Sequence, residues 1–153
     1  MEKIQKFELL NKQVESILDG ETNLVANLAN TCALIKETFN HFWIGFYLVD
    51  KEANNLVLGP FQGPMACTRI PFGKGVCGSS WSEKKTLVVD DVHQFPGHIA
   101  CSSQSNSEIV IPIFKDEEVF AVLDIDSDKL ATFDEVDKEY FEKLAAIVSK
   151  KLI

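Results

Sequence analysis

The sequence predicts an α+β domain with a mostly antiparallel central sheet of about five or six strands and with N- and C-terminal helices packed on one face of it. Three observations predict this class. Amphipathic stretches with apolar residues every three or four positions lie near both ends of the chain. Between them, short apolar or alternating segments are joined in pairs by turn-like residues, which is typical of hairpins. The length of 153 residues suits a single domain over 1–153.

Two helices are expected at the start of the chain, over residues 2–18 and 22–39. The first has an apolar stripe at Ile4, Phe7, Leu10, Val14 and Ile17. Asp19-Gly20 is predicted to end it. The second helix has its stripe at Leu24, Leu28, Cys32, Ile35 and Phe39.

A first hairpin is predicted where Phe42–Val49, rich in aromatic and branched residues, leads through turn-like residues to Leu56–Leu58. Glycine and proline recur from residue 59 to 80, and Gly59-Pro60 in particular is predicted to break regular structure. A short helix is expected from about Val76 to Glu83.

A strand at Thr86–Val89 is expected to lead into a loop from Asp90 to about Ser107. A loop of this length inside a compact domain is usually functional or disordered, and its histidines and cysteine favour function. Ile109–Phe114 and Val119–Ser127 are predicted to form a second hairpin.

A last helix follows, for which Thr132 and Glu135 have the spacing of a capping box. Its apolar stripe consists of Phe133, Val136, Tyr140, Leu144 and Ile147. The sequence contains no internal repeat and no low-complexity tract.

The alternation of side chains along a strand sorts each predicted strand into two faces. The faces expected to pack under the long helices hold Phe42, Ile44, Phe46 and Leu48, then Ile109, Ile111 and Ile113, then Ala121, Leu123 and Ile125. On the last strand the opposite face holds Phe120, Val122, Asp124 and Asp126. The opposite faces of the three strands should together gather Trp43, Tyr47, Glu108, Asp124 and Asp126 beneath the long loops.

Aromatic walls beside carboxylates are what a pocket for a small cationic ligand needs. The alternative is that Asp124 and Asp126 face solvent on a half-exposed sheet, and that Trp43 and Tyr47 are core residues. Because aspartate is disfavoured in strands, two of them in one apolar strand favour a site.

The net charge of −8, with no basic cluster beyond pairs such as Lys84-Lys85, makes nucleic acid a poor partner. No run reaches the roughly 18 apolar residues of a membrane span. The N-terminus also lacks the apolar stretch of a secretory signal. We therefore expect a soluble, cytoplasmic protein without a membrane partner.

Three of the four cysteines are candidates for chemistry. Cys32 lies on a helix stripe, where a free cysteine commonly acts as a small buried apolar residue. Cys67, Cys77 and Cys101 fall in glycine-rich and loop segments, where thiols can be exposed and can move. In a reducing compartment such thiols indicate a metal site or a redox role rather than structural disulfides.

A metal site is the weaker interpretation of these thiols. They are spaced by 10 and 24 positions, unlike the closely paired cysteines of zinc sites, although His93 or His98 could complete a ligand set. We predict no metal and no cofactor. His98, three positions before Cys101, could instead help to generate a thiolate.

Three segments, GPMACTRIPFGKGVCG, VVDDVHQFPGHIACSSQSNSEIVIPI and VLDIDS, resemble those of free methionine-R-sulfoxide reductases, a GAF-domain family. The resemblance covers essentially the whole chain. It implies a GAF fold, thiol-dependent reduction of the free amino acid sulfoxide, and thioredoxin as reductant. The preference for the R epimer is implied by the resemblance alone.

The resemblance also assigns site residues. It implies that Cys101 is the catalytic cysteine and Cys67 the resolving one, with Cys77 as a second or alternative resolving thiol. The implied pocket carboxylates are Glu108, Asp124 and Asp126, and the implied aromatic wall is Trp43 and Tyr47.

Residue chemistry supports this activity, because sulfoxide reduction needs a thiolate together with an acid. Three carboxyls crowded into one partly dehydrated site should raise at least one pKa and keep a proton available. The alternatives are a GAF sensory module that binds a small ligand without catalysis, and a metal or redox sensor. The sequence leaves a homodimer open.

Overall fold

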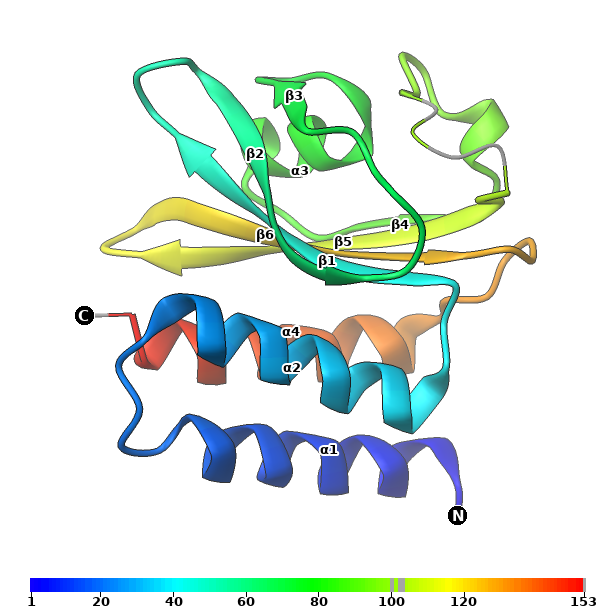
Figure 1. Ribbon diagram of the computed structural model, residues 1–153. Coiled ribbons are helices and arrows are strands. Elements are labelled where there is room, and N and C mark those ends of the chain that lie inside the picture. Colours follow the sequence, from blue (N-terminus) through cyan, green and yellow to red (C-terminus); the bar gives the residue numbers. More distant parts are fainter. Residues whose placement is uncertain (100, 102–103, 153) are drawn as a thin grey trace.

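The computed structural model describes residues 1–99, 101 and 104–152, and within them the chain forms the predicted helices and strands in the predicted order, with one further short strand, β3, before the short helix (Figure 1). The elements are α1 (Lys3–Leu18), α2 (Leu24–Phe39), β1 (Trp43–Asp50), β2 (Asn55–Gln62), β3 (Arg69–Pro71), α3 (Gly75–Glu83), β4 (Leu87–Val89), β5 (Ser107–Lys115), β6 (Glu118–Ser127) and α4 (Glu135–Lys150). A short 3₁₀ turn at Val92–Gln94 lies in the long loop after β4.

The strands form a six-stranded sheet in the order β3-β2-β1-β6-β5-β4, and each neighbouring pair is antiparallel. The predicted α+β class is confirmed. The sheet is built from two hairpins, β1–β2 and β5–β6, which join through β1 and β6 at its centre. This register places the pocket-facing residues of β1, β5 and β6 side by side.

Three helices lie on one side of the sheet, and α3 with the long loops lies on the other (Figure 1). α2 and α4 cover the sheet directly, whereas α1 packs on α2 and α4 as an outer layer. The main core lies between these helices and the sheet, where Phe7, Ile35, Phe46 and Phe141 are all fully buried. Among the described residues, none of the helices is both long and apolar enough to pass through a bilayer.

The structure corrects the prediction that Gly59-Pro60 breaks regular structure. Both residues lie inside β2, which runs on to Gln62. The β1–β2 register shifts between Gly45 and Tyr47, opposite these residues. A bulge accepts a proline because one backbone N–H is left out of the ladder there. The three-residue β3, which pairs with β2, also lies in the segment that was predicted to be irregular.

Two further predictions were wrong. The N-cap of α4 is Asp134, whose side chain accepts hydrogen bonds from the first turn, while the Thr132 hydroxyl donates to Ser127 instead. Phe42 precedes β1 and Phe120 lies where the β5–β6 register shifts, so simple alternation fails for both. Phe42 therefore packs on the pocket side of the sheet and Phe120 on the helix side.

Candidate active site

A row of acidic side chains crosses the centre of the sheet on the face opposite the long helices. Antiparallel pairing sets Trp43 of β1 opposite Asp126 of β6, and Asp126 opposite Glu108 of β5. Two residues along each strand, and therefore on the same face of the sheet, Asp124 lies between Gly45 and Val110. Glu108 and Asp124 are buried, with 6% and 5% of their surface exposed. The hydrogen-bonding register of three strands thus brings the three predicted carboxyls together.

A pocket forms above this row, and the described loop residues that line it are Met65, Ala66, His98, Ile99, Cys101 and Ser105. It brings together most of the predicted site residues. Those that line it are Trp43, Tyr47, Cys77, Cys101, Glu108, Asp124 and Asp126. Cys67 does not line the pocket itself but is bonded to Cys101, which does.

The two aromatic residues form a wall and also hold the loop that carries Cys67. The Trp43 indole stacks on Phe61 with ring centroids 5.3 Å apart, and its N–H donates to the Pro64 carbonyl at 2.9 Å. The Tyr47 hydroxyl donates to the Cys67 carbonyl at 2.8 Å. These bonds fix the β2–β3 loop against β1, a function of Trp43 and Tyr47 that the sequence did not reveal.

Cys67 and Cys101 form a disulfide that joins the β2–β3 loop to the loop after β4. Their Cα atoms are 5.3 Å apart, inside the range that a disulfide spans without backbone movement. Both cysteines are half-buried. The neighbouring Ile99 packs against Gly75, where a Cβ would meet Ile99 Cγ1 at 3.2 Å. The cysteine loop thus rests on the start of α3.

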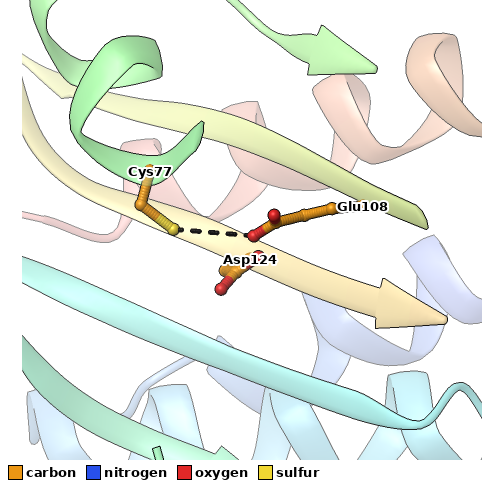
Figure 2. A group of neighbouring side chains, drawn as sticks. All are labelled: Cys77, Glu108 and Asp124. Atoms are coloured by element: carbon orange, nitrogen blue, oxygen red, sulfur yellow. Dashed lines mark hydrogen bonds between the residues drawn. The ribbon is translucent and has the colours of Figure 1, made fainter. Parts of the chain in front are cut away.

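Cys77 differs from the other two thiols. The prediction that it lies in an exposed, movable loop was wrong, because it sits in the first turn of α3 and is only 4% exposed. Its Sγ points down at the sheet and donates a hydrogen bond to Glu108 Oε2 at 3.9 Å (Figure 2). The short helix predicted from about Val76 is confirmed, but its closeness to the sheet was not predicted, because it depends on Gly75 and Gly78, which let α3 approach its neighbours closely.

The carboxyls are shifted toward their protonated forms. Burial raises the pKa of Glu108 well above its ordinary value, and the charges of Asp124 and Asp126 raise it further. Burial raises the pKa of Asp124, and burial with the charge of Asp124 raises that of Asp126. The predicted upward shift is therefore confirmed. Among the described residues that line the pocket, there is no lysine or arginine to offset these acids.

The same environment acts on the thiol and the phenol that face the acids. Burial, followed by the charges of Asp124 and Glu108, raises the pKa of the Cys77 thiol well above its ordinary value. Burial and the charge of Asp124 likewise raise the pKa of Tyr47. Because a thiol must ionise to act as a nucleophile, Cys77 is a poor one in this state.

The start of α3 offers backbone N–H groups to the pocket. Gly75, Val76 and Cys77 line it, and the N-cap residue Lys74 makes no side-chain capping hydrogen bond. Free N–H groups at a helix N-terminus favour an anion.

His98 lines the pocket, and its buried Nδ1 has no hydrogen-bond partner among the described residues. Burial, followed by the charge of His93, lowers its pKa, so the neutral imidazole is favoured. The His93 ring lies 6.3 Å from the His98 ring and its Nε2 contacts Asn106. In the described part of the chain, the side chains that converge as metal ligands are Cys77, Glu108 and Asp124, not the cysteine and histidine set considered from spacing.

Known proteins resemble this chain over nearly its whole length. A family profile described as GAF domain matches residues 21–151. GAF domain-containing protein A of Dictyostelium discoideum is 57% identical over 95% of this chain and 92% of that protein. The free methionine-R-sulfoxide reductase of Escherichia coli is 44% identical over 99% of this chain and 92% of that protein. This chain belongs to the free methionine-R-sulfoxide reductases, a GAF-domain family.

A solved structure agrees with this membership. Free methionine-R-sulfoxide reductase from Neisseria meningitidis, in complex with its substrate, is 54% identical and superimposes with a TM-score of 0.98. The match covers 99% of this chain and 91% of that one. The family and the GAF fold that the sequence motifs predicted are thus confirmed for this reductase homologue.

Some pocket residues of this reductase homologue were missed from the sequence. Phe42 was assigned to the helix side of the sheet, and Met65, Ala66 and Ser105 were not singled out. For Phe42 a signal existed. It lies in the short connection between the second helix and the first strand, where the alternation of a strand need not hold. Met65, Ala66 and Ser105 show no sequence pattern that indicates a pocket, because their position over the sheet depends on the conformation of the loops.

Proposed function

We propose that this protein reduces free methionine (R)-sulfoxide to methionine, with two of its own cysteines as electron donors. The observation that carries the proposal is the Cys67–Cys101 disulfide beside a pocket that holds three carboxyls with raised pKa values. A thiol pair supplies two electrons, and a protonated carboxyl supplies the acid that a sulfoxide oxygen needs. The named reductases at 44% and 54% identity support the substrate and its epimer.

Binding of the substrate uses the two kinds of polar group in the pocket. An ionised carboxylate in the cluster holds the substrate's ammonium group, with Trp43 and Tyr47 as aromatic walls around it. The substrate's carboxylate lies against the N–H groups at the start of α3. A peptide-bonded methionine lacks both terminal charges, which accounts for selection of the free amino acid.

In the chemical step, a protonated carboxyl of the cluster donates a hydrogen bond or proton to the sulfoxide oxygen. The Cys101 thiolate attacks the sulfur, methionine leaves, and the oxygen remains on Cys101 as a sulfenic acid. The neutral imidazole of His98, which lines the same pocket, accepts the Cys101 proton. Glu108, Asp124 and Asp126 can each hold the acid's proton, because the pKa of all three is raised by burial.

In the recycling step, the Cys67 thiol attacks the sulfenic acid, water leaves, and the Cys67–Cys101 disulfide forms. Cys67 suits this role better than Cys77, because it is already bonded to Cys101 and is half-buried. Cys77 is buried in α3 and its raised pKa keeps it protonated.

Thiol exchange with thioredoxin then returns the enzyme to its dithiol form. Because thioredoxin keeps thiols reduced in the cytoplasm, we propose that the protein acts there.

For the assembly state we propose a homodimer. Apolar side chains on α1 support it, since Ile4, Leu9 and Ile17 are 44%, 47% and 45% exposed. Light scattering of the purified protein tests this state.

The activity is tested by incubating the protein with racemic free methionine sulfoxide and dithiothreitol and following each epimer by chiral chromatography. We expect the R epimer to disappear and free methionine to appear in equal amount. If neither epimer is consumed, the proposal is wrong and a ligand-binding GAF module becomes the better explanation.

Cysteine variants test the assigned roles. Cys101→Ser should abolish turnover, because no other thiol lines the pocket in a nucleophilic state. Cys67→Ser should retain one rapid turnover but recycle slowly, since the sulfenic acid then waits for an external thiol. Cys32→Ser is the matched control, because Cys32 lies in the helix core, where burial raises its pKa to about 12. Full steady-state activity of Cys101→Ser would contradict the assignment.

A further inference from the structure

Three potential metal ligands converge on the floor of the pocket from three different elements. Cys77 descends from α3, Glu108 projects from β5 and Asp124 from β6 (Figure 2). One ligand atom from each lies within 4.8 Å of the other two. All three residues are buried. The group is therefore preassembled by the fold rather than gathered from mobile surface chains.

A second observation is a buried carboxyl oxygen of this cluster that has no hydrogen-bond partner among the described residues. Asp124 is only 5% exposed, and its buried Oδ1 receives no hydrogen bond from any described residue. No lysine or arginine is among the described residues lining the pocket. Burying a polar oxygen without a hydrogen-bond partner is costly, so a cation that binds Asp124 Oδ1 would be favoured.

The ligand types select the ion. One thiolate and two carboxylates suit a borderline divalent ion such as Zn²⁺ or its analogue Cd²⁺, whereas Mg²⁺ and Ca²⁺ take oxygen ligands only. With Zn–S of about 2.3 Å and Zn–O of about 2.0–2.2 Å, tetrahedral ligands lie roughly 3.3–3.6 Å apart. The 3.9 Å between Cys77 Sγ and Glu108 Oε2 is close to this spacing, and all three ligand atoms lie within 4.8 Å of one another.

We propose that Cys77, Glu108 and Asp124 form a binding site for a thiophilic divalent metal ion, and that the bound ion blocks the pocket. Binding displaces the Cys77 proton and any proton held by the two carboxyls, and involves no electron transfer. Affinity should therefore rise with pH, about tenfold per pH unit for each proton released. The fourth ligand position is left to water. The blocking effect rests on the proposed function, whereas the metal site itself does not.

The metal site is tested on the oxidised protein, in which the Cys67–Cys101 disulfide leaves Cys77 and Cys32 as the free thiols. Titration with Cd²⁺ should produce the ultraviolet thiolate-to-cadmium absorption of one cysteine per chain. We expect Cys77→Ser to lose this band and Cys32→Ser to keep it. Asp124→Asn should weaken Cd²⁺ binding at least tenfold.

Absence of the band in the oxidised protein, or its persistence in Cys77→Ser, would overturn the metal site. Circular dichroism of each variant shows that the fold is retained, and mass spectrometry shows that the disulfide is intact. Blocking is tested with the double variant Cys67→Ser, Cys101→Ser, which leaves Cys77 and Cys32 as the free thiols and should bind free methionine sulfoxide without turning it over. Added sulfoxide should raise the apparent Kd for Cd²⁺. If both ligands bind and neither affects the other, blocking is wrong; if Cd²⁺ binds but the sulfoxide does not, the proposed function fails and the metal site stands.

Discussion

Tyr47 links the sheet to one of the two disulfide-forming cysteines, because its hydroxyl donates a hydrogen bond to the Cys67 carbonyl. Tyr47→Phe removes this bond and keeps the ring. The free energy of unfolding should fall by about 1 kcal/mol, and Cys67 should be positioned less well for attack on the Cys101 sulfenic acid. Dimedone trapping of that acid during turnover should increase several-fold. Tyr140→Phe, on α4 beyond the sheet, is the matched control, and wild-type trapping in Tyr47→Phe would contradict this role.

Glu108 is a residue whose burial makes stability depend on pH. In the unfolded chain its carboxyl ionises near the ordinary value of 4.5, whereas in the folded protein it keeps its proton to a higher pH. The folded state then binds more protons than the unfolded state above pH 4.5, so the free energy of unfolding falls as pH rises through this window.

Glu108→Gln should remove the part of this dependence that Glu108 contributes, while the raised pKa values of Asp124 and Asp126 keep the rest. At pH 8 the variant should be more stable than the parent, by about 1.4 kcal/mol for each unit by which the pKa is raised, and it should lose activity. Below pH 4.5 the two should be nearly equal, since the parent carboxyl is then neutral as well. Urea unfolding at pH 4 and pH 8 measures the difference. Glu8→Gln, at an exposed position on α1, is the control, and a parent that is equally stable at both values would refute the explanation.

Residue types and strand alternation were enough to predict the acids and the aromatic wall. Glu108, Asp124 and Asp126 lie every second residue on strands whose other face is aliphatic, so their common face followed from period two. The depth of Cys77 did not follow, because it depends on how closely α3 packs on the sheet. That distance is a property of tertiary structure and leaves no periodic signal.

At the scale of elements, the contact between α3 and β3 depends on Gly78. A Cβ at this position would meet the Pro71 carbonyl oxygen at 2.6 Å and the Gly73 nitrogen at 3.2 Å, both of which are backbone atoms. Gly78→Ala must therefore move the helix rather than a flexible side chain. The shift should cost about 1–3 kcal/mol and displace both Cys77 and the N–H groups that face the pocket.

We expect Gly78→Ala to raise KM for free methionine sulfoxide about tenfold, with a smaller effect on kcat. Gly20→Ala is the control, since Gly20 has a φ of +79° but no atom within 4 Å of an added Cβ. It should lose stability through backbone strain of about 1–2 kcal/mol while KM stays the same. Steady-state kinetics with thermal unfolding of both variants separates the two effects, and an unchanged KM in Gly78→Ala would show that α3 does not position the substrate.

The elements that the sequence predicted well have strong internal periodicity, and those it missed depend on pairing. The stripe of α2 and the two hairpins were predicted, whereas the α1 stripe was right for Phe7, Leu10 and Val14 but wrong for Ile4 and Ile17, which are exposed. β3 was missed because its three residues gain their strand conformation only by pairing with β2. Pro60 was interpreted as a break because the bulge that accommodates it is defined by the neighbouring strand.

At the scale of the whole molecule, the sheet separates a stabilising side from a reacting side. One hydrophobic cluster joins the three long helices to the lower face of the sheet, and a second, which includes Trp43, Tyr47 and Cys77, lies around the pocket. α1 is the element furthest from the pocket, because α2 and α4 lie between it and the sheet (Figure 1). Stability and turnover should therefore respond to different sets of residues.

Phe7 tests this separation. It is fully buried in α1, and its ring contacts Phe39, Tyr140 and Phe141 with centroids 4.5, 5.3 and 4.9 Å away. Phe7→Ala should lower the free energy of unfolding by about 3–5 kcal/mol through lost burial and a cavity. At a temperature where the variant is still folded, kcat and KM should equal those of the parent.

The matched control is Val25→Ala in the neighbouring helix α2, where the side chain is 64% exposed and truncation should cost less than about 1 kcal/mol. Urea unfolding with steady-state kinetics on both variants gives the comparison. A fall in kcat for Phe7→Ala with an unchanged near-ultraviolet circular dichroism spectrum would show that the helical layer acts on the pocket through the sheet. Because the pocket is formed by side chains on the opposite face of the strands, we expect the stability change to leave the chemistry unaltered.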